Sequence, residues 1–74
     1  MKVTGARINI QWNGNKEVYF RSNDISEVRD RFEGVRRELV RLKTHFVRNL
    51  STIIETYDET TNTSRLYYIS LVAE

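Results

Sequence analysis

The sequence predicts an α+β fold of element order ββαββ, with one long helix packed across a four-stranded sheet. Three observations lead to this prediction. Apolar and polar residues alternate near the start of the chain and again near its end, which is typical of half-buried strands. Between these segments, apolar residues recur at steps of three and four, as on one face of a helix. A chain of 74 residues has room for one core only, so residues 1–74 form a single domain.

The first two strands are expected over residues 6–12 and 17–21, where every second side chain is apolar. Asn13-Gly14 between them normally indicates a two-residue turn. Such a turn would pair Ile10 with Glu17 and bury a carboxylate, whereas a three-residue loop over 13–15 pairs Ile10 with Val18. We therefore expect the three-residue loop, which also pairs Ile8 with Phe20.

The helix is expected to begin after Asp24, because an N-cap aspartate followed three residues later by Glu27 is a capping-box arrangement. A helix of about 22 residues would be roughly 33 Å long, enough to cross a sheet from end to end. Gly34 falls inside it and costs stability there, so it marks either the close approach of another backbone or a tolerated defect. The apolar stripe consists of Ile25, Val28, Phe32, Val35, Leu39, Leu42 and Phe46.

The last two strands are expected to form a hairpin around residues 58–63. A four-residue loop from Glu59 to Asn62 places Asn62 where a left-handed conformation is tolerated, and it pairs Ile54 with Tyr67. The last strand is the most apolar, so it should be central. A right-handed crossover through the helix would set it parallel to the first strand, giving strand order 2-1-4-3, with 2-1-3-4 as the alternative.

The stretch TYDETTNT over residues 56–63, together with the ββαββ order, resembles the β-grasp immunoglobulin-binding domain of protein G and its second hairpin. The resemblance implies a β-grasp-like fold. It implies no antibody-binding residues, because the helix and third-strand positions that would carry them have no recognisable match.

Composition and motifs argue against catalysis. The chain has no cysteine and one histidine, so it has neither a disulfide framework nor a thiolate or histidine-cluster zinc site. No nucleophile, base and acid are spaced in a known motif, and His45 near the expected helix end is best explained by the helix dipole. We expect no enzyme activity and no cofactor. The absence of an apolar run of signal-peptide or membrane-span length predicts a cytoplasmic protein.

One candidate site is the sheet face that the helix leaves uncovered. Strand alternation places aromatic and aliphatic side chains there beside arginines, a combination that is enriched in protein interfaces. The expected partner-binding residues are Tyr19, Ile53, Tyr57, Leu66 and Tyr68. Such a face can also stack nucleic-acid bases, although the sequence lacks the strand order and the motif of RNA-recognition domains.

A second candidate site is the basic second half of the expected helix. Arg37, Arg41 and Arg48 fall on one helical stripe, which could contact phosphates. Pairing with Glu33 and Glu38 offers an equally physical explanation. The full candidate set is Arg36, Arg37, Arg41, Lys43 and Arg48.

The sequence therefore predicts a small non-enzymatic binding protein that self-associates, as a homodimer, or docks onto a protein partner through its uncovered sheet face. Its size, with a methionine start and no signal or catalytic set, fits an accessory or inhibitor protein of a phage or mobile element. The alternative function is binding of nucleic acid or a phosphorylated ligand through the basic helix half.

Overall fold

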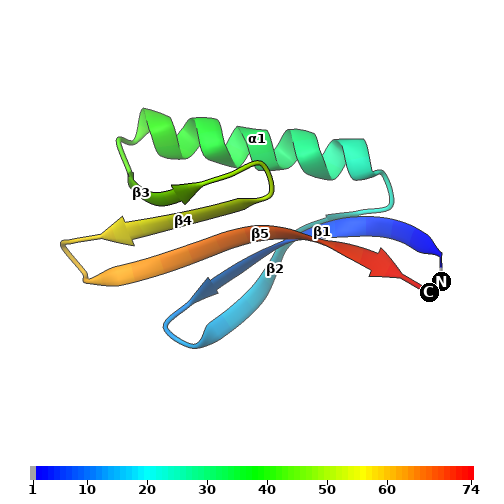
Figure 1. The fold of residues 1–74 in the computed structure, drawn as a ribbon, viewed down its shortest axis with the longest axis horizontal. Coiled ribbons are helices and arrows are strands. Elements are labelled where there is room, and N and C mark those ends of the chain that lie inside the picture. Colours follow the sequence, from blue (N-terminus) through cyan, green and yellow to red (C-terminus); the bar gives the residue numbers. More distant parts are fainter. Residues whose placement is uncertain (1) are drawn as a thin grey trace.

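The computed structural model describes residues 2–74 as one five-stranded antiparallel sheet with one helix on one face (Figure 1). The strand order is β2-β1-β5-β4-β3. The α+β class predicted from the sequence is correct, but the four-stranded ββαββ topology is wrong, because an additional strand follows the helix. The elements are β1 (Val3–Trp12), β2 (Asn15–Ser22), α1 (Ile25–Arg41), β3 (His45–Asn49), β4 (Ile53–Asp58) and β5 (Thr63–Ala73).

The helix has 17 residues, fewer than the expected 22. It begins as predicted, because the Asp24 carboxylate accepts hydrogen bonds from the backbone N–H groups of Ser26 and Glu27. It ends at Arg41, where Leu42 caps the last turn and Lys43 adopts the left-handed conformation with φ 57°. The chain then reverses, and Phe46 reaches the core from β3 instead of from a sixth helical turn.

The additional strand also changes the direction of the strands that follow. With β3 inserted after the helix, β5 runs opposite to β1, and the two pair antiparallel from Val3 with Ala73 to Trp12 with Arg65. The expected parallel central pair is therefore wrong, although the last strand is central and lies beside the first as predicted. One helix on one face of a mixed α+β unit remains loosely compatible with a β-grasp-like fold.

The first hairpin uses the two-residue turn that the pairing argument rejected. Asn13 and Gly14 have φ values of 47° and 79°, and Trp12 pairs with Asn15, so Ile10 faces Glu17. A β-bulge at Tyr19 then shifts the register by one residue and restores the pairing of Ile8 with Phe20. Because Glu17 lies near the exposed end of the hairpin, its carboxylate stays in water and the two-residue turn buries no charge.

The second hairpin agrees with the prediction. Asp58 pairs with Thr63 around a four-residue loop, Ile54 pairs with Tyr67, and Asn62 has φ 52°. The Asp58 carboxylate accepts a hydrogen bond of 2.9 Å from the Thr60 N–H, which stabilises the turn.

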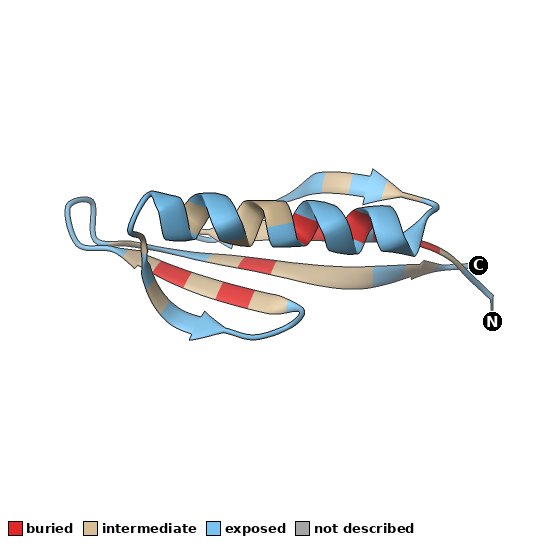
Figure 2. Ribbon diagram, turned by 90° about the horizontal axis from the view of Figure 1, so that it is seen from above, coloured by how far each residue is buried: buried red, intermediate tan, exposed pale blue. Residues whose placement is uncertain are grey.

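The core lies between α1 and the sheet, as the burial colours in Figure 2 show. Val28 and Phe32 are fully buried from the helix, and Ile8 and Ile54 are fully buried from β1 and β4. Leu39 and Val35 complete the helical contact from half-buried positions. The predicted apolar stripe is thus the packing face of the helix as far as Leu39, whereas Leu42 is 60% exposed.

Two glycines differ in what surrounds them. A Cβ on Gly5 would lie 2.5 Å from the Ser22 carbonyl oxygen and 2.9 Å from the Asn23 Cα. Because the backbone after β2 passes this close to β1, only glycine fits at position 5. A Cβ on Gly34 would meet only the Arg37 guanidinium, at 3.9 Å. Of the two interpretations of Gly34, the structure supports the tolerated defect, because no backbone approaches it.

Candidate binding face

The face of the sheet turned away from α1 is called the open face here. Cross-strand pairing fixes which side chains lie on it, because partners share a face and successive residues alternate. Asn9 pairs with Tyr68, and Tyr68 pairs with Ile53, forming a row across three strands. Three central rows are Lys16–Gln11–Leu66–Glu55–Arg48, Val18–Asn9–Tyr68–Ile53 and Arg21–Arg7–Ser70, and a further row, Ser64–Tyr57–His45, lies toward one edge.

The centre of the open face is an apolar hollow of about 290 Å³. Ile53, Leu66 and Tyr68 line it and are half-buried, so their remaining surface is available for contact. Gln11 and Arg48 border the hollow, and the Lys16 ammonium lies 5.8 Å from the centroid of the Tyr68 ring. The structure therefore brings three of the five predicted partner-binding residues together in one place.

A buried polar network fixes the floor beside this hollow. The Asn9 side chain is only 3% exposed, and its amide donates to the Ser70 hydroxyl at 2.8 Å and to the Tyr68 carbonyl at 3.4 Å. Arg7 donates from Nε to the same Ser70 hydroxyl at 3.3 Å. These bonds hold β1 and β5 in register under Tyr68, so the hollow rests on a rigid base.

The other two predicted residues lie outside the hollow. Tyr57 is on the open face near its edge, where its hydroxyl donates to the Asn62 side chain at 2.5 Å and its ring meets His45 edge-on, with centroids 6.4 Å apart. Tyr19 is the unpaired residue of the bulge in β2 and is 53% exposed. The bulge interrupts the strand alternation that predicts Tyr19 on the open face.

The open face is positively charged. The three central rows contain four cations, Arg7, Lys16, Arg21 and Arg48, against the single anion Glu55, whereas the whole chain has a net charge of only +2. Arg48 donates to Glu55 at 2.8 Å across β3 and β4. The remaining three cations form no salt bridge with residues 2–74, so the rim carries uncompensated positive charge.

The basic set predicted on the helix is dispersed. Arg48 belongs to β3 and Lys43 to the turn before it, so the expected stripe of Arg37, Arg41 and Arg48 does not exist. Arg41 binds Glu38, and this hydrogen bond lowers the pKa of the Glu38 carboxyl and raises that of Arg41. Such a pair leaves Arg41 less available to an outside phosphate.

Arg36 is a packing residue. Its guanidinium lies 5.5 Å from the centroid of Phe32 and donates to the Glu33 carboxylate at 3.0 and 3.1 Å. It also donates to the Asn49 side chain and, at 3.3 Å, to the Ser51 carbonyl. With 17% of its side chain exposed, Arg36 joins the helix to the loop between β3 and β4.

His45 lines a pocket of about 520 Å³ together with Asp58 and Glu59. His45 lies in β3 against Tyr57, so the helix dipole does not explain its position. Asp58 and Glu59 belong to the second hairpin turn. Among residues 2–74, no group of three histidine or acidic side chains could hold a metal ion, and no helix has the length and apolar content needed to cross a bilayer.

The chain matches no protein-family model, no curated protein and no solved structure. The resemblance of residues 56–63 to the protein G hairpin is therefore a likeness of one turn, which the structure does form.

Proposed function

We propose that the protein acts without chemistry, by binding another protein through its open face. The observation that carries the proposal is the apolar hollow of Ile53, Leu66 and Tyr68, half-buried and surrounded by polar and basic side chains. Protein interfaces combine an apolar, aromatic centre with a polar rim in this way. Tyr68 offers a large contact area with few rotamers to immobilise, which is why tyrosine is enriched among the residues that dominate binding energy.

The rim indicates the chemistry of the partner. Arg7, Lys16 and Arg21 lie on the β1–β2 side of the open face and form no salt bridge with residues 2–74. A complementary surface would place an apolar side chain into the hollow and carboxylates opposite these cations. Because rim charges act mainly on association rate, binding should weaken moderately with salt, while the hollow supplies most of the affinity.

The experiment compares capture of host proteins by the parent chain and by two charge variants. Leu66→Asp places a carboxylate in the hollow. Val40→Asp is the control, because Val40 is 57% exposed on α1, far from the open face. We expect a host protein that binds to the parent chain and to Val40→Asp but not to Leu66→Asp. Thermal unfolding should show that all three chains are folded. Retention by all three folded chains would contradict the proposal.

Nucleic acid is the second candidate ligand, and the net positive charge of the open face is the observation that favours it. The helical set supports it less, because Arg36, Arg41 and Arg48 each bind a carboxylate of the chain. A labelled single-stranded oligonucleotide, titrated at low and moderate salt, distinguishes the two ligand classes. Tight, steeply salt-dependent binding that Arg7→Glu abolishes would replace the protein-binding proposal.

A further inference from the structure

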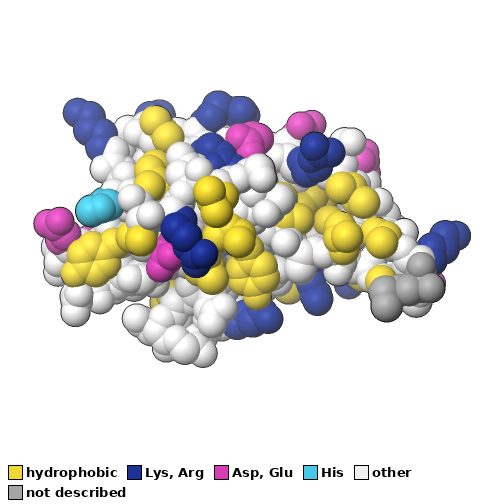
Figure 3. All heavy atoms as spheres, viewed as in Figure 1, with side chains coloured by type: hydrophobic (Ala, Val, Ile, Leu, Met, Phe, Trp, Pro, Cys, Tyr) yellow, Lys and Arg dark blue, Asp and Glu magenta, His cyan; other side chains and the backbone are white. Residues whose placement is uncertain are grey.

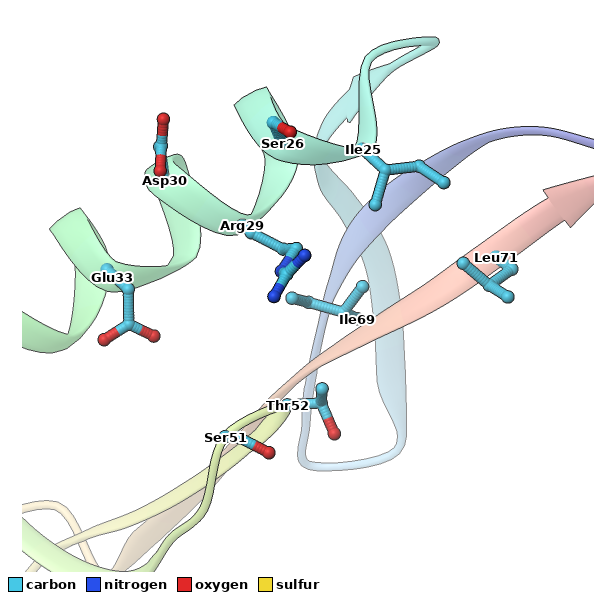
Figure 4. Close-up of a pocket in the computed structure, with 9 residues that line it drawn as sticks. All are labelled: Ile25, Ser26, Arg29, Asp30, Glu33, Ser51, Thr52, Ile69 and Leu71. Carbon is cyan, nitrogen blue, oxygen red and sulfur yellow. The ribbon is translucent and has the colours of Figure 1, made fainter.

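A groove lined by both apolar and polar side chains lies on the opposite side of the sheet from the open face, between the first half of α1 and the end of β5. Its volume is about 580 Å³. Figure 4 shows Ile25, Ile69 and Leu71 around this groove, with Arg29 projecting across it toward Ile69. Figure 3 shows hydrophobic side chains gathered on the corresponding part of the surface. Leu71 is 59% exposed and Ile25 is 36% exposed, so aliphatic surface remains in contact with water.

The groove exists because neighbouring strands differ in length. β5 has 11 residues and β4 has six, and their pairing ends where the Ile69 N–H donates to the Thr52 carbonyl at 3.1 Å. Beyond that point β5 pairs only with β1. Backbone groups of successive residues point to opposite sides of a strand, so Leu71 and Ala73 direct their N–H and C=O groups to the side that β4 leaves empty. An open strand edge of this kind is a template for another strand.

The end of β5 itself is a strand with the side chains that this groove requires. Leu71 and Ala73 lie on the helix side, because Leu71 lines the groove and Ala73 follows it by two residues. In an antiparallel pair of two such edges, Leu71 of each copy faces Ala73 of the other. Both hydrogen-bonded pairs then form, and each exchanges two N–H···O bonds. A shift by two residues in one direction meets Thr52, and a shift in the other direction leaves one pair among residues 71–74.

The same register produces a favourable charge contact on the open face. Ser70 of one copy would face Glu74 of the second copy, and Ser70 already accepts a hydrogen bond from Arg7 at 3.3 Å. The Arg7 side chain therefore extends over Ser70 toward the unpaired edge of β5. Glu74 of the second copy would extend the row Arg21–Arg7–Ser70 with the carboxylate that this row lacks. Two-fold symmetry repeats the contact on the other side.

We infer that the occupant of this edge is a second copy of the chain, so that two β5 strands join two sheets into one continuous sheet with both helices on the same face. The two grooves then meet and cover each other's Leu71. The groove shares Thr52 and Ile69 with the hollow, whereas Ile53, Leu66 and Tyr68 lie outside the residues that pair in this register. The inference goes beyond the proposed function and does not depend on it.

Sedimentation and light scattering on the full chain over a range of concentrations test the inference. The parent should show twice the 8.8 kDa chain mass, about 17.6 kDa. Leu71→Lys should shift it to the monomer without unfolding, because Leu71 is already 59% exposed. The matched control is Leu42→Lys, at 60% exposure near the other end of α1, which should remain a dimer. A parent that stays monomeric at every concentration, or a Leu71→Lys dimer, overturns the inference.

Amide hydrogen exchange identifies the edge independently. In the dimer, the N–H groups of Leu71 and Ala73 should exchange slowly, and in Leu71→Lys the two should exchange fast. The N–H groups of Ser70 and Val72 point toward β1 and should stay protected in both. Arg7→Glu and Glu74→Arg should each weaken the dimer by about two- to five-fold, and combining them should restore it. Fast exchange at Leu71 and Ala73 in a dimeric parent would place the interface elsewhere.

Discussion

Replacing Arg36 by alanine separates a structural role of the basic helix residues from a ligand-binding role. Arg36 and Arg37 are adjacent arginines with different surroundings. Arg36 contacts Phe32, Glu33 and the β3–β4 loop, whereas Arg37 is exposed and forms no salt bridge with residues 2–74. Arg37→Ala is therefore a matched control for Arg36→Ala.

The magnitude follows from the contacts that are lost. The cation–π contact with Phe32 contributes about 0.5–1 kcal/mol. The hydrogen bonds to the Ser51 carbonyl and the Asn49 side chain contribute about 1–1.5 kcal/mol together, discounted for partial exposure. The pair with Glu33 adds little, because Glu33 is 48% exposed. Arg36→Ala should lower the free energy of unfolding by about 2 kcal/mol.

Thermal and urea unfolding followed by circular dichroism measure this difference. For a domain of this size, about 2 kcal/mol lowers the melting temperature by roughly 8–16 °C. Arg37→Ala should change the free energy of unfolding by less than about 0.5 kcal/mol. Equal effects of the two substitutions would refute the reasoning, because they would show that Arg36 does not join the helix to the loop.

Further predictions concern Gly5, Gly34 and Tyr67. Gly34→Ala should raise the free energy of unfolding by about 1 kcal/mol, because alanine favours the helix and its Cβ meets only the end of Arg37. Gly5→Ala should lower the free energy of unfolding by about 1–3 kcal/mol, because the Cβ would overlap the Ser22 carbonyl oxygen. Urea unfolding measures both variants, and a Gly5→Ala chain more stable than Gly34→Ala would contradict both expectations. Burial raises the pKa of the Tyr67 hydroxyl above its ordinary value, so the folded chain holds this proton more tightly than the unfolded chain. The resulting stability is complete below the ordinary tyrosine pKa of about 10 and is lost as pH rises toward the pKa in the folded chain. Between pH 9 and pH 11, the urea midpoint should therefore fall less for Tyr67→Phe than for the parent. Equal falls would show that the buried hydroxyl does not contribute to the pH dependence of stability.

Local signals in the sequence determined much of the fold. The Asp24 cap, the second hairpin and the apolar stripe from Val28 to Leu39 were predicted correctly, because each depends on residues close together in the chain. The open face followed from strand alternation for the same reason. Its centre at Ile53, Leu66 and Tyr68 lies where that alternation is regular.

The end of the helix was mispredicted because the apolar residues after Leu39 fit the spacing of a helix and can also belong to a strand. Leu42 and Phe46 continue the helical spacing, and no glycine or proline follows Leu39 to indicate a stop. Lys43 takes the left-handed conformation that glycine or asparagine usually supplies. Phe46 then packs on the same core from a strand, so its apolar character is satisfied by either arrangement.

Two features could not be found from local sequence. The bulge at Tyr19 restores the pairing of apolar residues in the first hairpin. No residue type in this part of the sequence indicates that β2 contains an additional, unpaired residue. The open edge of β5 depends on the unequal lengths of β4 and β5 and on which strands become neighbours. Tertiary pairing decides both features, so strand alternation alone revealed neither the irregularity at Tyr19 nor the groove beside Leu71.

The most direct test of the proposed function is site-specific photo-crosslinking in the cells that produce the protein. A photoreactive amino acid replaces Tyr68 in the hollow in one chain and Val40 on the exposed side of α1 in another. Binding through the open face predicts a discrete protein adduct from position 68 and none from position 40. Adducts of equal yield from both positions, or an adduct from position 40 alone, would contradict it.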